Sequence, residues 1–393
     1  MANPSKELKV RYQQDLMIWR TPLLRAGLLT LLFLYILSPI IWESFVVTKF
    51  LDDIGLTMTT LNYAGVFAVG AIGLNLLTGY TGQVSLGHSV FVGAGAYFAA
   101  YAGSTWDLPF IVWLPGSLLV GFLIGFIVGP LALRLRGNYL VVVTLGLVFL
   151  GDHIFRNWKS VTGGSTGVSV TGASLKIGPI DFRNFEVFGH EFEKSQSFFW
   201  LIWGFVALVA LLVKNIVRTR PGRALQAVRD RDIAAEIIGV DLLHYKTMAF
   251  AISSSIAALA GALFGVLQSF ISPIDFGLLV AIQYIAIIIL GGMGTIHGSI
   301  IGALVLGSLP RLVENISRDY DLPGVSGDQG GIGGILSISS LNHIIYGILI
   351  AAFLLLEPRG IAGIWMRIKT CLLYTSDAAD EGLGVDLGGR RII

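Results

Sequence analysis

The sequence predicts an all-α polytopic membrane protein with about ten transmembrane helices, and three observations support this fold class. Hydrophobic residues make up 54% of the 393 residues and charged residues only 13%, and the mean hydropathy is +0.76. Apolar runs of about 20 residues, the length that spans the hydrocarbon core of a bilayer, recur along the chain. The 49 glycines fit the same class, because helix packing in lipid relies on small residues. Membrane lipid is therefore the expected surrounding.

Ten apolar runs are candidate spans, and the charges between them support that number. The runs cover 24–42, 59–78, 84–104, 113–133, 139–155, 198–214, 247–271, 277–290, 295–310 and 342–357. With ten spans and a cytoplasmic N-terminus, the inside segments carry 17 Lys and Arg and the outside segments carry 8, as the positive-inside rule requires. The eighth and ninth runs could form one long interrupted helix, but that count would put either the most basic loop or the basic tail outside. We therefore expect both termini in the cytoplasm.

Composition divides the chain into three parts. Residues 1–23 form a cytoplasmic N-terminal segment, and 24–370 form the transmembrane domain. From Cys371 the chain turns polar, and CLLYTSDAADE resembles the translation of a transposon-type sequencing adaptor. We therefore expect 371–393 to be a non-native read-through tail; a disordered cytoplasmic tail is the alternative. Because Cys371 is the only cysteine, an internal disulfide and a cysteine-based metal cluster are excluded.

The most informative segment is a charged loop at 214–246, which lies between two strongly apolar runs. It holds seven of the 27 Lys and Arg residues. Pro221-Gly222 ends the preceding span, and Ala234-Ala235-Glu236 belongs to a short helix that Gly239 ends. Alanine side chains are small enough to let another protein approach closely, and Gly239 permits a backbone reversal that a β-carbon would resist. These features suit a short, rigid helix that moves as one body on the cytoplasmic side.

Two Gly-rich segments interrupt apolar runs in the two halves of the chain. The first, GYTGQVSLGH at 79–88, contains the expected helix breaks Gly79, Gly82 and Gly87. The second, GGMGTIHGS at 291–299, contains the expected helix breaks Gly291, Gly292 and Gly294. Paired interruptions favour an internal, inverted repeat with broken helices near a substrate path. Two ordinary Gly-rich turns explain the pattern equally well, because the segments share little sequence.

Polar side chains inside the apolar runs are the candidates for a translocation path. Polar groups are costly in lipid, so they usually face the protein interior or a pathway. The candidates are Asn75, Gln83, Ser85 and His88 at the first Gly-rich segment, Thr144 in the fifth run and His297 at the second segment. Hydrogen bonding or capping between helices is the alternative role for each of them.

Several long segments together resemble one known family. They are NLLTGYTGQVSLGHSVFVGAGAY (75–97), RLRGNYLVVVTLG (134–146), TGGSTGV (162–168), RTRPGRALQAVRDRDIAAEIIGVD (218–241) and AIIILGGMGTIHGSIIGA (286–303). In this order they are similar to segments of the LivM family, the permease subunits of the branched-chain amino acid ABC importer. The similarity runs from about residue 60 to EPRGIAGIW at 357–365, so it covers most of the chain.

The resemblance implies an import permease of the bacterial inner membrane that other polypeptides drive. The implied partners are a LivH-like second permease, two cytoplasmic ABC ATPase subunits and a periplasmic amino acid binding protein. It also implies that Ala234, Ala235, Glu236 and Gly239 couple the chain to an ATPase. The chain has no G-x-x-x-x-G-K-[ST] phosphate loop, so ATP is expected on the partner subunits and no cofactor on this chain.

Other functions fit the sequence less well. Permeases for urea or short amides are closely similar, but the pattern here lies nearer to the amino acid group. An ion-coupled secondary transporter needs charged residues within its spans, and no expected span carries a clear mid-membrane Asp or Glu. The histidines are scattered without an HExxH pattern, so neither a catalytic nor a metal site is predicted. A net charge of +2 is too small to indicate nucleic acid binding.

Overall fold

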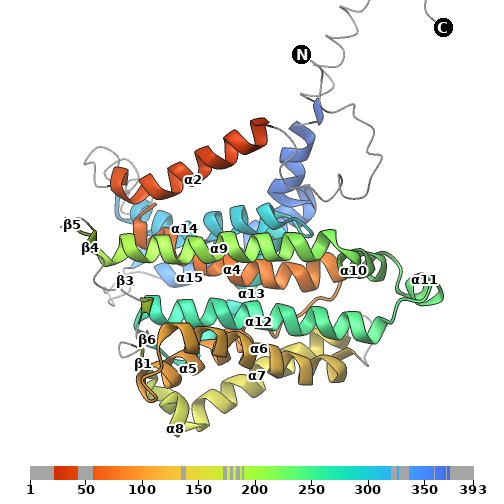
Figure 1. Cartoon of the computed structure of the whole chain (residues 1–393), viewed down its shortest axis with the longest axis horizontal. Helices are drawn as coiled ribbons and strands as arrows, with labels where there is room; N and C mark the ends of the chain where they lie inside the picture. Colours follow the sequence, from red (N-terminus) through yellow and green to blue (C-terminus); the bar gives the residue numbers. More distant parts are fainter. Residues whose placement is uncertain are drawn as a thin grey trace, which may run out of the picture.

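The computed structural model describes residues 22–42, 56–133, 139–170, 175–177, 180–182, 186–187, 190–319, 325–326, 336–357, 359–368 and 370–371. Long helices dominate this described part (Figure 1). They are α2 (Pro22–Trp42), α4 (Met58–Thr81), α5 (His88–Ser104), α6 (Phe110–Leu133), α7 (Tyr139–Asn157), α9 (Lys194–Arg218), α12 (Leu242–Gln268), α13 (Leu278–Gly291), α14 (Ile296–Asp319) and α15 (Ile338–Leu356).

Short elements connect the long helices. The helical ones are α8 (Lys159–Thr162), η1 (Gly164–Thr166), α10 (Arg220–Asp230), α11 (Asp232–Ile237) and η2 (Pro273–Phe276). The antiparallel strand pairs are β1 (Val168–Ser169) with β6 (Phe270–Ile271), β2 (Lys176–Ile177) with β3 (Ile180–Asp181), and β4 (Glu186–Val187) with β5 (His190–Glu191). A parallel pair joins β7 (Val325–Ser326) and β8 (Leu336–Ser337).

Seven segments of the described chain are long and apolar enough to cross a bilayer, judged by length and composition. They are Met58–Thr81, Phe110–Pro130, Tyr139–Asn157, Lys194–Arg218, Leu242–Gln268, Pro273–Gly291 and Ile296–Asn315. Helices suit this environment because each satisfies its own backbone hydrogen bonds where lipid cannot. The chain is therefore an all-α polytopic membrane protein, as predicted.

Side chains and special backbone angles mark where the central helices begin and end. Thr57 caps α4, because its hydroxyl accepts a hydrogen bond from Thr60 N at 3.1 Å. Asp241 caps α12 in the same way through His244 N at 3.1 Å. At the C-terminus of α4, Gly82 adopts φ 74° and its N–H donates to the carbonyl oxygens of Leu77 and Thr78.

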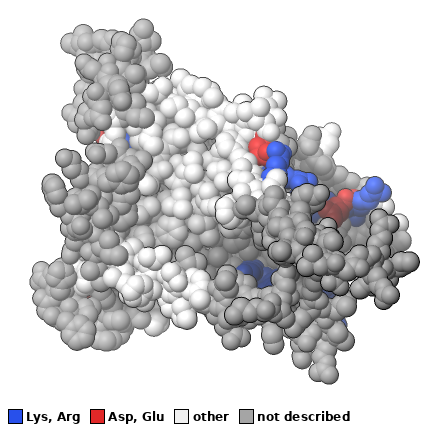
Figure 2. All heavy atoms as spheres, turned by 90° about the horizontal axis from the view of Figure 1, so that it is seen from above, with Lys and Arg blue, Asp and Glu red and all other residues white. Residues whose placement is uncertain are grey.

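The bundle has two distinct ends, which Figure 1 shows at the right and left of the picture. We call the end that carries α10 and α11 the α10 end, and the end where β1 pairs with β6 the β6 end. Helix α12 runs from the first to the second, because it follows α11 and precedes β6 in the chain. On the face seen in Figure 2, most of the coloured Lys, Arg, Asp and Glu side chains gather toward the right-hand end, where Figure 1 places α10 and α11. A charged end beside a broad white surface without charged side chains is expected for a protein that leaves the membrane at that end.

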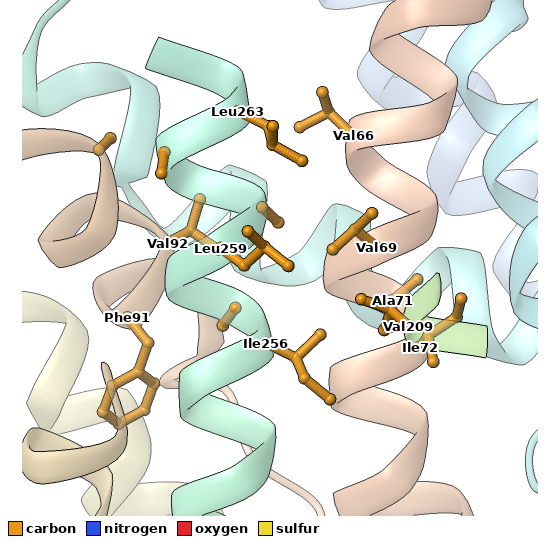
Figure 3. Packing of buried hydrophobic residues seen from close by; sticks show 14 of the residues in the cluster. Val66, Val69, Ala71, Ile72, Phe91, Val92, Val209, Ile256, Leu259 and Leu263 are labelled. Atoms are coloured by element: carbon orange, nitrogen blue, oxygen red, sulfur yellow. The ribbon is translucent and has the colours of Figure 1, made fainter. Parts of the chain in front are cut away.

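Helix α12 lies at the centre of the core, between α4 on one side and α5 and α6 on the other (Figure 3). Its side chains toward α4 are large and apolar. In Figure 3, α12 presents Leu263, Leu259 and Ile256 in successive layers toward Val66, Val69 and Ile72 of α4. All six are buried. Burying each such side chain contributes about 1.5–3 kcal/mol in water, whereas in lipid close packing supplies the gain.

On its other side, α12 packs through small residues instead. A β-carbon on Gly95 of α5 would overlap the backbone of Ala258, and one on Gly261 of α12 would overlap the backbone of Val92. On α6, a β-carbon at Gly121 would lie 2.5 Å from the carbonyl oxygen of Ser254. Backbones that approach this closely leave no room for a side chain, which explains part of the high glycine content.

The helices that precede the two Gly-rich segments, α4 and α13, run in the same direction. Gly307 of α14 packs on Ala64 near the start of α4, whereas Ser299 near the start of α14 bonds to Asn75. Thus α14 is antiparallel to α4. It is also antiparallel to α13, since a β-carbon on Gly302 would meet the Ile287 carbonyl. Helices α4 and α13 are therefore parallel, so these two helices are not inverted copies of one another, and the inverted repeat stays a prediction for other helix pairs.

Some expectations concern residues that lie outside the described part. These are the N-terminal segment up to residue 21, the short loop 134–138 and nearly all of the adaptor-like tail from Cys371 onward. Cys371 itself is exposed.

Candidate functional site

The first Gly-rich segment is a non-helical stretch that turns back into the bundle. Helix α4 ends at Thr81, Gly82 reverses the chain, and α5 begins only at His88. The His88 ring lies 2.8 Å, Nε2 to O, from the carbonyl of Gly70, halfway along α4. Six extended residues reach about 20 Å, and the helix from Gly70 to Thr81 is about 16 Å long. The segment can therefore carry the chain from the α10 end back to the middle of α4.

Gly79 is not a helix break, because α4 continues through it. A β-carbon there would overlap the Asn75 amide and lie 2.5 Å from the backbone nitrogen of Gly294. Glycine is thus required at this position for close approach between chain segments, not for a change of direction. Gly82 and Gly87, in contrast, bound the non-helical stretch: Gly82 is the C-cap of α4 and Gly87 the N-cap of α5.

The second Gly-rich segment is a tight turn between α13 and α14. Gly291 is the last residue of α13 and packs on the backbone of Gly298. Gly292 and Gly294 adopt φ values of 116° and 78°, which a residue with a β-carbon rarely adopts. The turn therefore requires glycine at both positions. The structure contains two separate helices here, not one interrupted helix.

Asn75 joins the two Gly-rich segments across the bundle. Its side-chain nitrogen donates to the Thr295 carbonyl and to the Ser299 hydroxyl, both at 2.8 Å. Its side-chain oxygen accepts from Gly294 N at 2.8 Å. The buried Asn75 amide thus uses three of its four hydrogen-bonding positions, namely both donors and one of the two acceptors. We call this contact the Asn75 junction.

Arg229 of α10 reaches the same junction from the charged loop. Its guanidinium donates to the carbonyl oxygen of Gly79 at 2.5 Å. A β-carbon on Gly294 would lie 2.9 Å from the same guanidinium nitrogen, and one on Gly82 would lie 3.3 Å from the Arg229 side chain. A charged donor forms a stronger hydrogen bond than a neutral one. One residue therefore connects the charged loop to both Gly-rich segments.

The remaining polar candidates have separate environments. Thr144 is buried on α7, and its hydroxyl accepts from Leu86 N at 3.0 Å. Ser85 accepts from Gly87 N at 3.3 Å. Neither polar atom of the buried Gln83 side chain has a hydrogen-bond partner among the described residues. His297 lies apart from these groups: it is exposed on α14, close enough to Lys214 of α9 to feel its charge.

The charged loop contains two short helices with different roles in packing. Helix α10 buries Gly222, Leu225 and Val228. Helix α11 is anchored by the buried Ala235, and Asp232 at its start pairs with Lys246 at 3.8 Å. These contacts fix α11 to the body of the bundle.

The other predicted coupling residues face outward. Ala234, Glu236 and Gly239 are exposed. Gly239 adopts φ 92°, and its N–H donates to the Glu236 carbonyl at 3.0 Å. A β-carbon there would meet nothing within 4 Å, so the space above Gly239 is open to a partner.

Three isoleucines on this surface were missed by the sequence interpretation. Ile233, Ile237 and Ile238 are 69%, 81% and 75% exposed, although they lie at the polar end of the molecule. Apolar side chains gathered on a polar surface mark an interaction site. Their spacing around Ala234-Ala235-Glu236 within an otherwise charged loop is a signal that could have identified them.

A family model described as "Branched-chain amino acid transport system / permease component" matches residues 56–356. The chain belongs to this permease family. It is a family of transport permeases and not of enzymes.

Individual relatives agree with this family. The high-affinity branched-chain amino acid transport system permease protein LivM of Salmonella typhimurium is 33% identical over 270 residues, or 65% of this chain and 62% of LivM. LivM of Escherichia coli is 32% identical with the same coverage. LivH of Salmonella typhimurium is 27% identical over 307 residues, which cover 76% of this chain and 91% of LivH. The chain thus spans less than two thirds of the LivM relatives, and no solved structure matches it.

Proposed function

We propose that this permease is the membrane-spanning subunit of an ATP-driven importer for branched-chain amino acids in the bacterial inner membrane. The relatives named for branched-chain amino acid transport support the substrate class. One structural observation carries the ATP-driven part of the proposal. Within a transport-permease region, α11 is a short anchored helix that exposes isoleucines at the polar end of the bundle.

The proposed topology has ten crossings with both termini in the cytoplasm. Each expected span overlaps one of the ten long helices of the described part. Helix α5 completes its crossing together with the non-helical stretch after Gly82, since the two lie in series. An even number of crossings puts residues 1–23 and the segment after α15 on the side of α10. The β6 end then faces the periplasm.

The cytoplasmic partner is proposed to be an ABC ATPase that docks on α11. Exposed isoleucines supply the apolar contact area, and Glu236 lies between them at the rim. The small Ala234 and the open space at Gly239 allow the partner to approach closely. A LivH-like second permease with its own ATPase would complete the membrane part, and a periplasmic amino acid binding protein would meet the β6 end.

Arg229 gives this docking site a physical connection to the membrane interior. Because α10 and α11 are linked through Arg231 without a loop between them, motion of α11 displaces α10. The hydrogen bond from Arg229 to Gly79 transmits that displacement to the Asn75 junction. We infer that ATP-driven motion alters the two Gly-rich segments by this route.

The substrate route is inferred to pass the non-helical stretch 82–87. A zwitterionic amino acid needs hydrogen-bond partners for its ammonium and carboxylate groups. The unpaired Gln83 amide and the backbone groups that no helix satisfies could provide them. Asn75, in contrast, uses its amide to join helices, so its role is to hold the route in shape.

The test is uptake by the purified complex in proteoliposomes. Radiolabelled leucine and urea are compared with ATP inside, without ATP, and without ATP under a sodium or proton gradient. The proposal expects leucine uptake with ATP only, and little urea uptake. Uptake by this chain alone under an ion gradient would indicate a secondary transporter, whereas preferential urea uptake would correct the substrate class.

A further inference from the structure

A partly open cavity of about 280 Å³ lies between the membrane helices toward the β6 end. Residues of α4, α5, α12, η2, α13 and α15 line it. Phe67, Phe264, Leu279 and Tyr346 make its walls largely apolar. A volume near the lower limit of about 300 Å³ for small-molecule sites suits a ligand the size of an amino acid.

One negative charge lines this apolar cavity. Asp275 of η2 uses its Oδ2 atom locally, accepting from Ser272 N at 2.7 Å and from the Ser272 hydroxyl at 2.9 Å. Its Oδ1 atom has no hydrogen bond, and the carboxylate has no ion pair within the described chain. A carboxylate beside apolar walls is stabilised by a cation that pairs with it. A ligand with a positively charged group would therefore supply the cation that the Asp275 carboxylate lacks in this cavity.

Two neutral polar groups, Gln283 and Tyr284 of α13, line the same cavity as Asp275. The Tyr284 side chain is only 1% exposed, yet its hydroxyl has no hydrogen-bond partner among the residues that the structure describes. The same holds for the amide of Gln283, which also lines the cavity. Both groups can donate hydrogen bonds to a carboxylate.

We propose that this cavity binds a free zwitterionic amino acid with an aliphatic side chain before it is translocated, an inference that rests on the proposed function. The ammonium group pairs with Asp275, and the carboxylate accepts hydrogen bonds from Gln283 and Tyr284. The aliphatic side chain lies against Phe67, Phe264 and Leu279. Charged or strongly polar side chains are rejected because these walls offer them no hydrogen-bond partner.

The position of the cavity agrees with a site early on the route. Its inner wall is formed by Tyr284, whose ring centroid lies 5.2 Å from that of His88. His88 begins α5 directly after the non-helical stretch 82–87. A ligand that displaced Tyr284 would therefore reach the first Gly-rich segment. A β-carbon on Gly70 would lie 2.8 Å from the Tyr284 hydroxyl oxygen, so this glycine makes room for the phenol.

Protection of an introduced cysteine tests the site directly. The complete complex carries Cys371→Ser and Leu279→Cys, and maleimide labelling is followed without binding protein while leucine is titrated. Leucine is expected to slow labelling, and isocaproate, which lacks the ammonium group, to protect poorly. Asp275→Asn keeps an acceptor for Ser272 but removes the charge. It should raise the half-protecting leucine concentration by about tenfold, the loss expected for a charged hydrogen bond.

Two further variants keep the result decisive. Ile274→Cys provides a second labelled position in the cavity, and Ser165→Cys provides an exposed position at the same end outside it. Labelling of the Ser165→Cys complex should not depend on leucine. The site is wrong if leucine protects neither cavity position in a complex that transports leucine. It is also wrong if leucine protects the Asp275→Asn complex at the same concentration as the complex that retains Asp275. Protection without ATP-dependent uptake would support the site and contradict the proposed function.

Discussion

The Arg229 guanidinium donates a hydrogen bond to the carbonyl oxygen of Gly79 at 2.5 Å, joining two residues 150 positions apart. Through it, the charged loop contacts the end of α4, and through Asn75 the same place contacts the turn between α13 and α14. The contact is short and lies on α10, the helix that directly precedes α11. It gives the proposed coupling a pathway whose parts can be changed one at a time.

Removing the guanidinium should weaken transport more than it weakens the subunit. We expect Arg229→Ala to reduce ATP-dependent leucine uptake by about tenfold, which corresponds to about 1.4 kcal/mol. This value is near the lower limit for a hydrogen bond to a charged group, because much of the Arg229 side chain is exposed. Uptake and ATP hydrolysis are measured on the same proteoliposomes. Arg223→Ala is the matched control, since Arg223 bonds to Arg218 O at the corner of α9 and α10. Equal losses in both variants would show that only loop charge matters.

Asn75 should contribute mainly to stability. Asn75→Ala leaves the part-buried Gly294 N–H without its acceptor and the Ser299 hydroxyl without the amide donor, and the Thr295 carbonyl loses one of its donors. We expect the free energy of unfolding to fall by about 2–3 kcal/mol, the cost of such unsatisfied groups. Thermal unfolding of the purified subunit in detergent measures the change. Asn157→Ala, which removes only exposed contacts to His153 one helical turn away, should leave the melting temperature nearly unchanged.

The small residues of α12 make a sharper steric prediction. Gly261→Leu cannot be accommodated, because even a β-carbon overlaps the Val92 backbone. We expect the folded subunit to be lost from the membrane. Overpacking costs about 1–3 kcal/mol where neighbouring side chains can adjust, and it costs more here because the overlap is with backbone. Gly146→Leu on α7 is the control, as a β-carbon there meets nothing within 4 Å. Membrane-inserted protein is quantified by fluorescence-detected gel filtration; similar yields for both variants would contradict the packing.

The exposed isoleucines predict a docking phenotype. Ile237→Asp places a charge in the middle of the proposed contact and should reduce co-purification of the ATPase by at least about tenfold, as for a central apolar anchor. The subunit should fold normally, because Ile237 is 81% exposed and contributes little to the core. Gln226→Asp adds the same charge on the exposed face of α10 and serves as the control. Retention of the ATPase by Ile237→Asp would place the dock elsewhere.

The sequence predicted the fold class and the position of the charged loop, because both follow from local composition. Hydropathy and loop charge identified nearly every long helix, and Gly239 with its neighbours identified α11. Asn75 was recognised as a polar residue that must face inward, but its bonds to a turn more than 200 positions away depend on packing that no local pattern encodes. The neighbouring Ser299 and His297 differ for the same reason. One faces α4 and is buried, and the other is exposed.

The separate roles of the glycines in the two Gly-rich segments could not be predicted for a related reason. Glycine permits both a sharp turn and a close contact, and sequence alone does not distinguish them. Gly292 and Gly294 have left-handed φ values and form a turn, whereas Gly79 stays helical and makes room for Gly294.

The central claim is that motion of an ATPase enters this permease through α11, and Gly239→Trp tests it most directly. A side chain at Gly239 meets nothing within 4 Å in the subunit, although it strains the backbone at φ 92°. Gly239→Asn introduces a β-carbon at the same φ without much bulk and is the matched control, so the additional effect of tryptophan is obstruction of a partner. Leucine uptake and membrane content are measured for both complexes in ATP-loaded proteoliposomes. We expect both variant subunits to be present in the membrane in normal amounts. Leucine uptake should be lost in the Gly239→Trp complex and remain substantial in the Gly239→Asn complex. Full ATP-dependent leucine uptake by the Gly239→Trp complex would contradict the claim.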